Sequence, residues 1–468
     1  MSEGRAVLFV ALAALGLRLA YTLGVYLALG PDGLLIEDSG MYVSLALSFI
    51  EHGDFVAMVG GGAVLPVTER MPLYVIFLVA HFFIQGSAHP LFPALTQAAL
   101  DALTCVLVAR LAARFDPRLL LPAGLIAALN PTQIVVGATL LTDSIFLLIC
   151  TVGLTAALDW MRRPSWRSAI LLGAALALGI SARAMLVPWL VAVIVLLPLG
   201  ALWLRTLRPA ALAHLVLAGV IAVACQAPIL ARNISEYGTA QLTSQTGTHA
   251  MGWVVPLVRE AKDGTSQAEG ARELDRAYRA RYGDAEPDNP FESSRRRTDF
   301  AYEAWAELGL GATAKAWLMG AAINLFSPGV ILATPISKLP RTGFFDTPGE
   351  SKLDKVRSFL FANDNAAYAW ALLLGTLGVI LARAAQAAGL AVGFAKGGPG
   401  ARERRVMLVF LLIWAAYILA VNGPIASPKY RLPIEPVAAL LFALALVSCF
   451  AWLRKRAAGR ARTPARAR

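Results

Sequence analysis

Two carboxylates and five basic residues occur where apolar segments of the chain give way to short polar loops. They are Asp38, Asp143, Arg70, Arg183, Arg232, Lys429 and Arg431. An arginine offers a phosphate group parallel N–H donors, and a lysine offers it a compact positive charge. A carboxylate beside them can accept a hydrogen bond from a sugar hydroxyl or act as its general base. The set therefore predicts a site that holds a phosphate and orients a hydroxyl group.

Simpler explanations exist for these residues as well. Asp38, in the run EDSGMY, and Asp143, in LLTDS, both stand where a helix is expected to begin, and either could serve only as a helix cap. The basic residues could bind the headgroups of anionic lipids. Both alternatives stay open on the sequence. The arrival of seven such residues from separate segments favours a common site.

Four further polar residues are candidates for substrate contacts, because each lies in or beside the same loops. They are Glu69, Tyr74, Asn233 and His249. No histidine or cysteine shows the spacing of a metal site. Asp38 and Asp143 could share a divalent cation, but two carboxylates are a small ligand set. The sequence therefore assigns no cofactor and leaves a divalent cation open.

The composition indicates what kind of scaffold must position these residues. Of the 468 residues, 57% are hydrophobic and only 15% are charged, and the mean hydropathy is +0.62. Such a chain needs an apolar solvent, which a lipid bilayer supplies. The net charge of +12 does not indicate nucleic-acid binding, because many basic residues lie in short loops and in the tail 454–467. We therefore predict an all-α polytopic membrane protein that does not bind nucleic acid.

About ten transmembrane helices are expected from the apolar runs. The runs are 6–29, 91–114, 118–138, 143–161, 168–182, 184–204, 211–231, 367–389, 406–422 and 434–453. The runs 71–86 and 317–336 are short or interrupted, and we expect them along the outer membrane interface. This places the short basic loops and both termini in the cytoplasm, as basic loops generally are. The polar segments that carry the candidate residues then meet at the outer face.

Three regions follow from this topology. Residues 1–231 form an N-terminal transmembrane module whose first outer loop, 30–90, carries Asp38. Residues 232–366 form an outer-face segment with interfacial helices, and we expect two soluble helices within 259–315. Residues 367–468 supply the last transmembrane helices and a basic cytoplasmic tail. The Ala- and Arg-rich composition suggests a bacterium, so the predicted location is the inner membrane with the site facing the periplasm.

Several short motifs, in order, carry a resemblance to a known family. They are an arginine in LRLAY (Arg18), then EDSGMY, RMPLY, NPTQ, LLTDS, SARAML, ILARNISEYG and PKYRLPIEP. The chain resembles the polyprenyl-phosphate-sugar-dependent glycosyltransferases of the GT-C fold, in the bacterial family-39 branch. Relatives there include the protein O-mannosyltransferases and the lipid A aminoarabinose transferases. The resemblance covers most of the chain and is weakest over 260–366.

This resemblance implies roles for individual residues. Asp38 would be the catalytic carboxylate of the first loop, Asp143 the second acidic residue, and Arg70 a contact to the donor phosphate. The enzyme would be an inverting transferase that uses a sugar on a polyprenyl phosphate, such as undecaprenyl phosphate, and a lipid, glycan or protein as acceptor. A lone aspartate follows Glu37 where the O-mannosyltransferases have an Asp-Glu pair, which puts a protein acceptor in doubt.

A transporter or flippase of lipid-linked sugars is the alternative from another functional class. Transporters place their substrate sites near the middle of the bilayer, commonly in internally repeated folds. This sequence shows no repeat, and its few midplane charges include Arg18 and Asp101. Both lie at a similar expected depth, where an unpaired charge is costly. We therefore predict that Arg18 and Asp101 form a buried structural pair.

Overall fold

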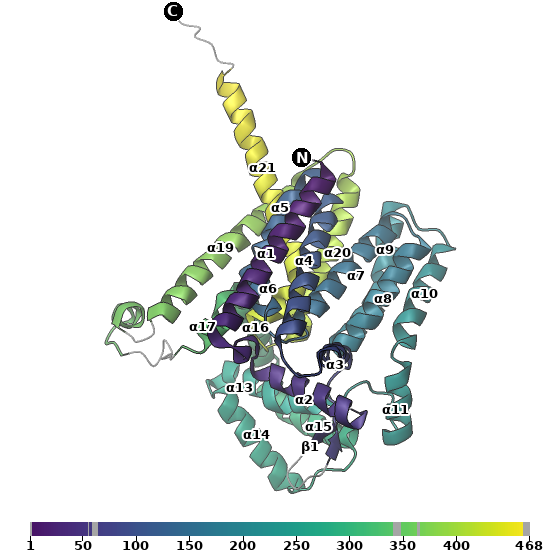
Figure 1. Ribbon diagram of the computed structural model, residues 1–468, viewed down its shortest axis with the longest axis vertical. Coiled ribbons are helices and arrows are strands. Elements are labelled where there is room, and N and C mark those ends of the chain that lie inside the picture. Colours follow the sequence, from purple (N-terminus) through teal and green to yellow (C-terminus); the bar gives the residue numbers. More distant parts are fainter. Residues whose placement is uncertain (1, 55, 59–63, 340–347, 363–365, 462–468) are drawn as a thin grey trace, which may run out of the picture.

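A computed structural model describes the chain except for residues 1, 55, 59–63, 340–347, 363–365 and 462–468. The described part is helical apart from one short hairpin, in which β1 (Val56–Met58) pairs antiparallel with β2 (Val64–Pro66). The predicted all-α membrane class is therefore confirmed. Long helices form an elongated bundle that has the start of α1 and the end of α21 at one end, and shorter helices gather at the opposite end (Figure 1). We call these the terminal end and the site end.

Seven helices in the described residues are long and apolar enough to cross a membrane, and two bent pairs raise the number to nine. The seven are α1 (Glu3–Leu29), α4 (Leu91–Ala113), α7 (Asp143–Arg162), η3 with α9 (Ala184–Leu186, Val187–Leu204), α19 (Ala366–Ala395), α20 (Ala401–Asn422) and η7 with α21 (Pro428–Ile434, Glu435–Ala461). Helix α8 (Trp166–Ala182) is apolar but has 17 residues. The seven helices, the two bent pairs and α8 together make ten elements, and these correspond one for one to the ten runs expected from the sequence.

The two bent pairs break at polar or proline-containing positions. The first joins η2 (Pro117–Leu119) and α5 (Leu120–Ala128) to α6 (Pro131–Gly137), with a bend of 53°. Asn130 stands at this break and its side-chain oxygen accepts from the N–H groups of Thr132 and Gln133, which starts α6 in a new direction. The second joins α10 (Ala211–Ala224) to α11 (Ala227–Tyr237), with a bend of 49°.

The shorter elements lie mainly at the site end. They are η1 (Pro31–Leu34), α2 (Glu37–His52), α3 (Leu73–Gln85), α12 (Gln245–His249), η4 (Ala250–Val254), α13 (Val255–Asp263), α14 (Gln267–Tyr282), α15 (Pro290–Leu308), α16 (Leu310–Phe326), η5 (Gly329–Leu332), α17 (Thr334–Ser337), α18 (Lys352–Arg357) and η6 (Ser358–Ala362). Helices α14 and α15 are the two helices expected within 259–315. Helix α3 covers the expected interfacial run 71–86. It is seen nearly end-on in Figure 1, whereas α1 and α4 are seen lengthwise, so α3 runs across the direction of the bundle. The run 317–336 is interrupted after Phe326, as its Ser-Pro-Gly sequence predicted.

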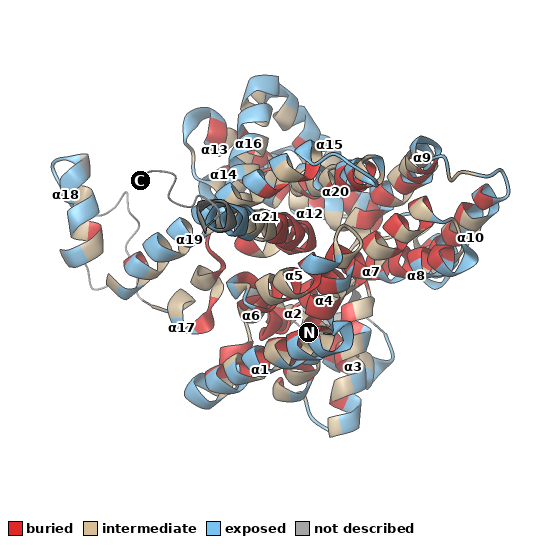
Figure 2. Cartoon of the chain, turned by 90° about the horizontal axis from the view of Figure 1, so that it is seen from above, coloured by how far each residue is buried: buried red, intermediate tan, exposed pale blue. Residues whose placement is uncertain are grey.

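The bundle packs through small residues and leaves large apolar side chains on its outside. Buried residues line the centre, whereas the outer faces of α1, α9 and α10 are exposed (Figure 2). Leu12 on α1 is 61% exposed and Val191 on α9 is 62% exposed, as expected for faces in contact with lipid. Helices α19 and α21 approach closely at Gly389, where a Cβ atom would collide with the Leu441 carbonyl.

The predicted pair in the middle of the bundle is confirmed. Arg18 on α1 and Asp101 on α4 are each 1% exposed, and Arg18 Nε lies 2.6 Å from Asp101 Oδ2. The other Arg18 N–H groups donate to the carbonyls of Ala14, Ala127 and Ala128 and to the Cys105 sulfur. Gln133 of the NPTQ motif donates to Asp101 Oδ1 at 3.2 Å. The pair therefore ties α1 and α4 to the broken helix α5–α6.

Candidate functional site

The first outer loop delivers Asp38 to the site end through the start of α2. The helix begins at Glu37, and the Ile36 N–H donates to Ser39 Oγ at 3.0 Å. Ser39 therefore satisfies the free N–H at the helix start, and Asp38 is the second helical residue with its carboxylate directed elsewhere. The interpretation of Asp38 as a helix cap is wrong.

Lys429, which lies 391 residues after Asp38 in the sequence, forms an ion pair with it. It lies in η7, just before the last long helix, and its Nζ is 2.7 Å from Asp38 Oδ2. The Asp38 side chain is 46% exposed and that of Lys429 is 14% exposed. Burial alone would raise the pKa of Asp38, but the hydrogen bond and charge of Lys429, helped by Arg70 and Arg183, lower it below its usual value. Asp38 is therefore an ionised carboxylate at neutral pH.

Asp143 and Arg183 form a second ion pair beside the first. Helix α7 starts at Asp143, whose Oδ2 lies 2.7 Å from Arg183 Nη2. Asp143 is 3% exposed and makes no capping hydrogen bond, so the cap interpretation is wrong here too. Arg183 also donates to Thr142 Oγ1 and lies over the Phe146 ring, 5.1 Å from its centroid. These contacts explain a basic residue in so tight a connection between α8 and α9.

Tyr42 lies close to both ion pairs. It lies one helical turn after Asp38 on α2, within electrostatic range of Asp38, Asp143, Arg70 and Arg183. Burial raises the pKa of Tyr42, so its hydroxyl stays protonated and can donate a hydrogen bond. Its ring packs edge to face on Tyr74 at 5.0 Å. Tyr74 is itself buried, and its hydroxyl donates to Gln97 at 2.6 Å, which makes it a support for Tyr42.

Arg70 is the cation of the cluster that lacks a carboxylate partner. Its Nε donates to the Met41 sulfur at 3.2 Å, and it forms no ion pair with any residue that the structure describes. It is partly buried, within electrostatic range of Asp38 and of His249. A partly buried guanidinium with free N–H groups is suited to bind an anion. Arg70 is therefore the best placed of the predicted phosphate ligands.

The outer helices close over this side of the site. Thr248 Oγ1 donates to Glu69 Oε1 at 2.6 Å, and Thr68 and Ser244 share a hydrogen bond of 2.6 Å. His249 lies beside them, its ring nitrogen 2.8 Å from Gln245. Burial and the charge of Arg70 lower the pKa of His249, which favours the neutral imidazole. The loop with Glu69 and helix α12 thus face each other, although 179 residues separate Glu69 from Thr248.

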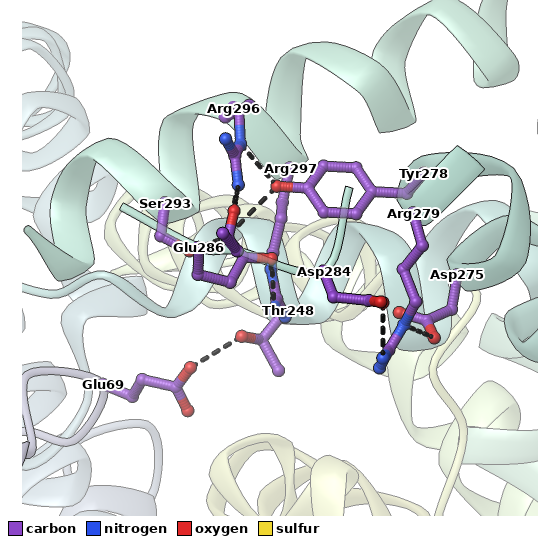
Figure 3. A network of polar contacts seen from close by, with 11 residues as sticks. Glu69, Thr248, Asp275, Tyr278, Arg279, Asp284, Glu286, Ser293, Arg296 and Arg297 are labelled. Carbon is purple, nitrogen blue, oxygen red and sulfur yellow. Dashed lines mark hydrogen bonds and ion pairs between the residues drawn. The ribbon is translucent and has the colours of Figure 1, made fainter. Parts of the chain in front are cut away.

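The Glu286 carboxylate is the hub of a polar network that holds the outer helices together (Figure 3). Burial alone would raise the pKa of Glu286, but hydrogen bonds from Ser293 and Arg297, together with Arg296, lower it to about 2. Arg296 also donates to the Tyr278 hydroxyl at 2.7 Å. The hub links α14 to α15, and α15 in turn packs on α12, where the Gly247 N–H donates to Ser294 Oγ at 3.0 Å. This frame fixes the position of Thr248 and His249.

Arg431 lies two residues from Lys429, but its guanidinium is engaged by the protein. It donates to Glu435 at 2.9 Å, to Thr132 at 2.8 Å and to the carbonyls of Asn324 and Ser327. Four of its five N–H groups are thereby used, and the residue is 3% exposed. The structure gives Arg431 a role in fixing η7, and therefore in placing Lys429.

Arg232 and Asn233 are not brought into the cluster. Both lie on α11, where Arg232 donates to the side-chain oxygen of Asn233 at 3.0 and 3.1 Å. Asn233 is fully buried and donates to the Gln241 carbonyl at 2.7 Å, so it orders the turn after α11. Five of the seven charged candidates therefore lie together. Arg431 supports this cluster through η7, and Arg232 lies outside it.

Metal ligands are few at this site. Among the described residues, no group of three or more histidine, cysteine, aspartate or glutamate side chains lies close enough together to hold a metal ion. Asp38 and Asp143 are each already paired with a cation of the protein.

Comparisons with known proteins point to similar membrane structures. The structure is similar to the crystal structure of ArnT from Cupriavidus metallidurans bound to undecaprenyl phosphate, with 16% sequence identity and a TM-score of 0.40 over 95% of this chain and 78% of that chain. It is also similar to ArnT from the same organism in the apo state, with 14% identity and a TM-score of 0.33 over 91% of this chain and 76% of that chain. No protein-family model and no curated protein sequence matches the chain. With TM-scores this low, the function proposed below rests on the site residues.

Some site residues were missed by reasoning from the sequence. Tyr42 could have been found, because it follows Asp38 by four residues on the same helix face. Thr248 carried no such signal, since its contact with Glu69 depends on how the outer helices fold back. Met41 and Thr142, which contact Arg70 and Arg183, are likewise ordinary residues made relevant by position.

Proposed function

We propose that the protein is an inverting glycosyltransferase that moves a sugar from a polyprenyl phosphate to an acceptor at the outer face of the bacterial inner membrane. The observation that carries this proposal is the charge of the site. Arg70, Arg183 and Lys429 supply three positive charges, and Asp38 and Asp143 supply two negative ones. Among these five residues the difference, 3 − 2, is +1, and Arg70 is the cation without an ion-pair partner among the described residues. Glu69, at the edge of the site, is not counted and accepts a hydrogen bond from Thr248.

This surplus charge matches the proposed donor. A sugar joined to a polyprenyl phosphate through a phosphodiester carries one negative charge, which Arg70 can neutralise with two parallel hydrogen bonds. The prenyl chain remains in the lipid, so the donor reaches the site end of the bundle within the membrane. A donor of this kind needs no separate nucleotide-binding domain, and the sequence contains no Gly-rich nucleotide motif after a strand.

The reaction would proceed by direct displacement at the sugar. The acceptor oxygen forms a bond to the anomeric carbon, and the bond from that carbon to the phosphate oxygen breaks. The electron pair of the broken bond leaves with the phosphate, whose charge grows from about −1 towards −2. Arg70 stabilises this growing charge because its N–H groups are already in position, and Lys429 and Arg183 add to the positive field.

Asp38 is suited to act on the acceptor. Lys429 holds Oδ2, and no described residue donates a hydrogen bond to Oδ1. The lowered pKa of Asp38 makes it a weak base, so its main contribution is to orient the acceptor hydroxyl and to take up its proton late in the displacement. Asp143 would keep Arg183 in place, Glu69 and His249 would shape the sugar pocket, and Tyr74 would support it from behind through Tyr42.

The acceptor class follows less directly from the site. A lipid, a glycan or a protein could each present a hydroxyl group or a phosphate oxygen to Asp38. The lone aspartate that follows Glu37, where the O-mannosyltransferases have an Asp-Glu pair, favours a lipid or glycan over a protein. The alternative function, transport of lipid-linked sugars, is disfavoured by the middle of the bundle, where Arg18 and Asp101 are both 1% exposed and bound to each other. A transporter needs an accessible polar path there.

The experiment that tests the proposal uses the purified protein with a panel of sugars on polyprenyl phosphate. We expect transfer to an added lipid or glycan acceptor, with release of the polyprenyl phosphate, and we expect Asp38→Asn to abolish it. Asp32→Asn is a matched control, because Asp32 is an exposed carboxylate of the same outer loop, outside the cluster. Full turnover in Asp38→Asn, or loss of turnover in Asp32→Asn as well, would contradict the assignment.

A further inference from the structure

A cavity lined by both apolar and charged residues lies at the terminal end of the bundle, far from Asp38 and Lys429. Its volume is about 400 Å³, within the range of small-ligand pockets. Its walls come from the start of the bent helix at η2, from the end of α19, from the start of α20 and from the middle and later turns of α21. The described chain shows α19 and α21 side by side in both views (Figures 1 and 2). The proposed transferase chemistry makes no use of this cavity.

The polar lining of the cavity has a strong excess of positive charge. Arg118, Lys396, Arg404 and Lys455 line it, and Asp116 is its one acidic lining residue. The sum is 4 − 1, or +3. Asp116 is already shared, with Arg118 at 2.7 Å and Lys396 at 3.4 Å. It cannot also neutralise the other two cations.

The remaining two cations differ in how they are held. Arg404 is 8% exposed and donates to the carbonyls of Gly393 and Lys396, which fixes it at the end of α19. Lys455 forms no hydrogen bond or ion pair with any residue that the structure describes, although it stands on the cavity wall. One cation is therefore preorganised, and another is free to move onto a ligand.

The rest of the wall is apolar and continues onto the outside of α21. Leu444, Val447 and Trp452 line the cavity from this helix, and the Arg456 guanidinium lies over the Trp452 ring, 4.2 Å from its centroid. Trp452 is 50% exposed and the neighbouring Phe450 is 56% exposed. Aromatic side chains of this kind are enriched where a membrane meets water. A phosphate in the cavity would thus lie beside a surface suited to acyl chains.

We propose that this cavity binds the phosphate headgroup of an anionic glycerophospholipid, with the acyl chains along the exposed apolar face of α21. The positive lining supplies the affinity for the phosphate, and basic pockets between transmembrane helices are known to favour acidic lipids. A free phosphate would gain the same ionic contacts but none of the apolar ones. The inference does not depend on the transferase activity.

The test measures lipid binding to the purified, delipidated full-length protein in neutral detergent. Phosphatidylglycerol and phosphatidylcholine are titrated separately, and binding is read by native mass spectrometry. We expect phosphatidylglycerol to bind at least about tenfold more tightly. Loss of one cation near a membrane surface weakens acidic-lipid binding by about fivefold, so the double variant Arg118→Gln, Lys455→Gln should lose about 25-fold. Asp116 keeps Lys396 as a partner in that variant, so the fold is preserved.

Arg454→Gln is the matched control. Arg454 is an exposed neighbour of Lys455 on α21 and does not line the cavity. It should bind phosphatidylglycerol as the unmodified protein does. Equal weakening by Arg454→Gln would mean that the basic tail attracts lipid without a site, and would overturn the proposal. So would the absence of a preference for phosphatidylglycerol, or equally tight binding of soluble glycerol 3-phosphate, which would indicate a site for free anions.

Discussion

Replacing Asp101 with leucine should destabilise the protein by about 3–5 kcal/mol, because the change leaves a permanent charge unpaired inside the bundle. Arg18 and Asp101 are each 1% exposed and 2.6 Å apart. The other N–H groups of Arg18 donate to three carbonyls and a cysteine sulfur, which orient the guanidinium but cannot neutralise it. Two charges about 4 Å apart attract by about 4 kcal/mol at an effective dielectric constant of 20.

The two single changes should not be equivalent. A carboxyl group that loses its partner can take up a proton, whereas a guanidinium stays charged. Arg18→Leu should therefore destabilise less than Asp101→Leu. The double variant removes both charges, so it should be more stable than Asp101→Leu alone. We expect a coupling energy of at least about 2 kcal/mol in the double-mutant cycle.

The cycle can be measured by detergent-induced unfolding of the purified protein in mixed micelles, followed by tryptophan fluorescence. Arg114 and Asp159 provide an internal control with the same residue types. Their two N–O contacts are both 2.6 Å, but the side chains are 22% and 40% exposed. An exposed pair should give a coupling energy below about 1 kcal/mol. Additive effects at Arg18 and Asp101, or equal coupling in the two cycles, would refute the argument from burial.

Three further outcomes are expected. Lys429→Met should raise the pKa of Asp38, because it removes the main group that lowers it, so the acidic limb of the kcat/KM profile should move to higher pH. Arg70→Ala should raise the donor KM by roughly ten- to a hundredfold, as expected for loss of a charged hydrogen bond worth about 1.5–3 kcal/mol. Cysteines placed at His89 and Arg114 in intact cells should be labelled from outside and from inside respectively, since the two positions flank α4.

Each of these expectations has a control or a result that would contradict it. Lys338→Met removes a similar charge at the site end, where Lys338 donates to the Asp32 carbonyl, and should leave the pH profile unchanged. An unshifted profile in Lys429→Met would separate Lys429 from Asp38 in the reaction. Unchanged kinetics of Arg70→Ala at limiting donor would mean that Arg70 meets only lipid headgroups. Labelling in the reverse sense would invert the proposed orientation.

The arrangement of the membrane helices could be predicted because hydrophobic length leaves few alternatives. Each expected run corresponds to a helix, a bent pair or the shorter α8. The pairing of Arg18 with Asp101 also followed from the sequence, since the cost of a lone charge and an estimate of depth point to one partner. The same reasoning could not find Gln133, which reaches Asp101 only because the chain bends at Asn130.

The details of the site were harder to foresee. Convergence of Asp38, Asp143, Arg70, Arg183 and Lys429 followed from topology, but the choice of partners did not. Nothing in the sequence distinguishes Lys429, which faces Asp38, from Arg431, which faces Glu435. Two residues apart in a short helix, they point in different directions, and side-chain direction depends on packing with distant segments. The separation of Arg232 from the cluster has the same cause.

Helix α21 gives the protein a mechanical property of its own. It runs for 27 residues from Glu435, six residues after Lys429, and the part that ends at Lys455 in the terminal-end cavity spans about 30 Å. A helix of this length is stiff along its axis, so a tilt imposed at one end displaces the other. Membranes of different thickness change helix tilt. Thinning or thickening of the bilayer would therefore act first on η7, which Arg431 ties to Thr132, Asn324 and Ser327, and through η7 on the Lys429–Asp38 ion pair, whose geometry would then respond to membrane thickness.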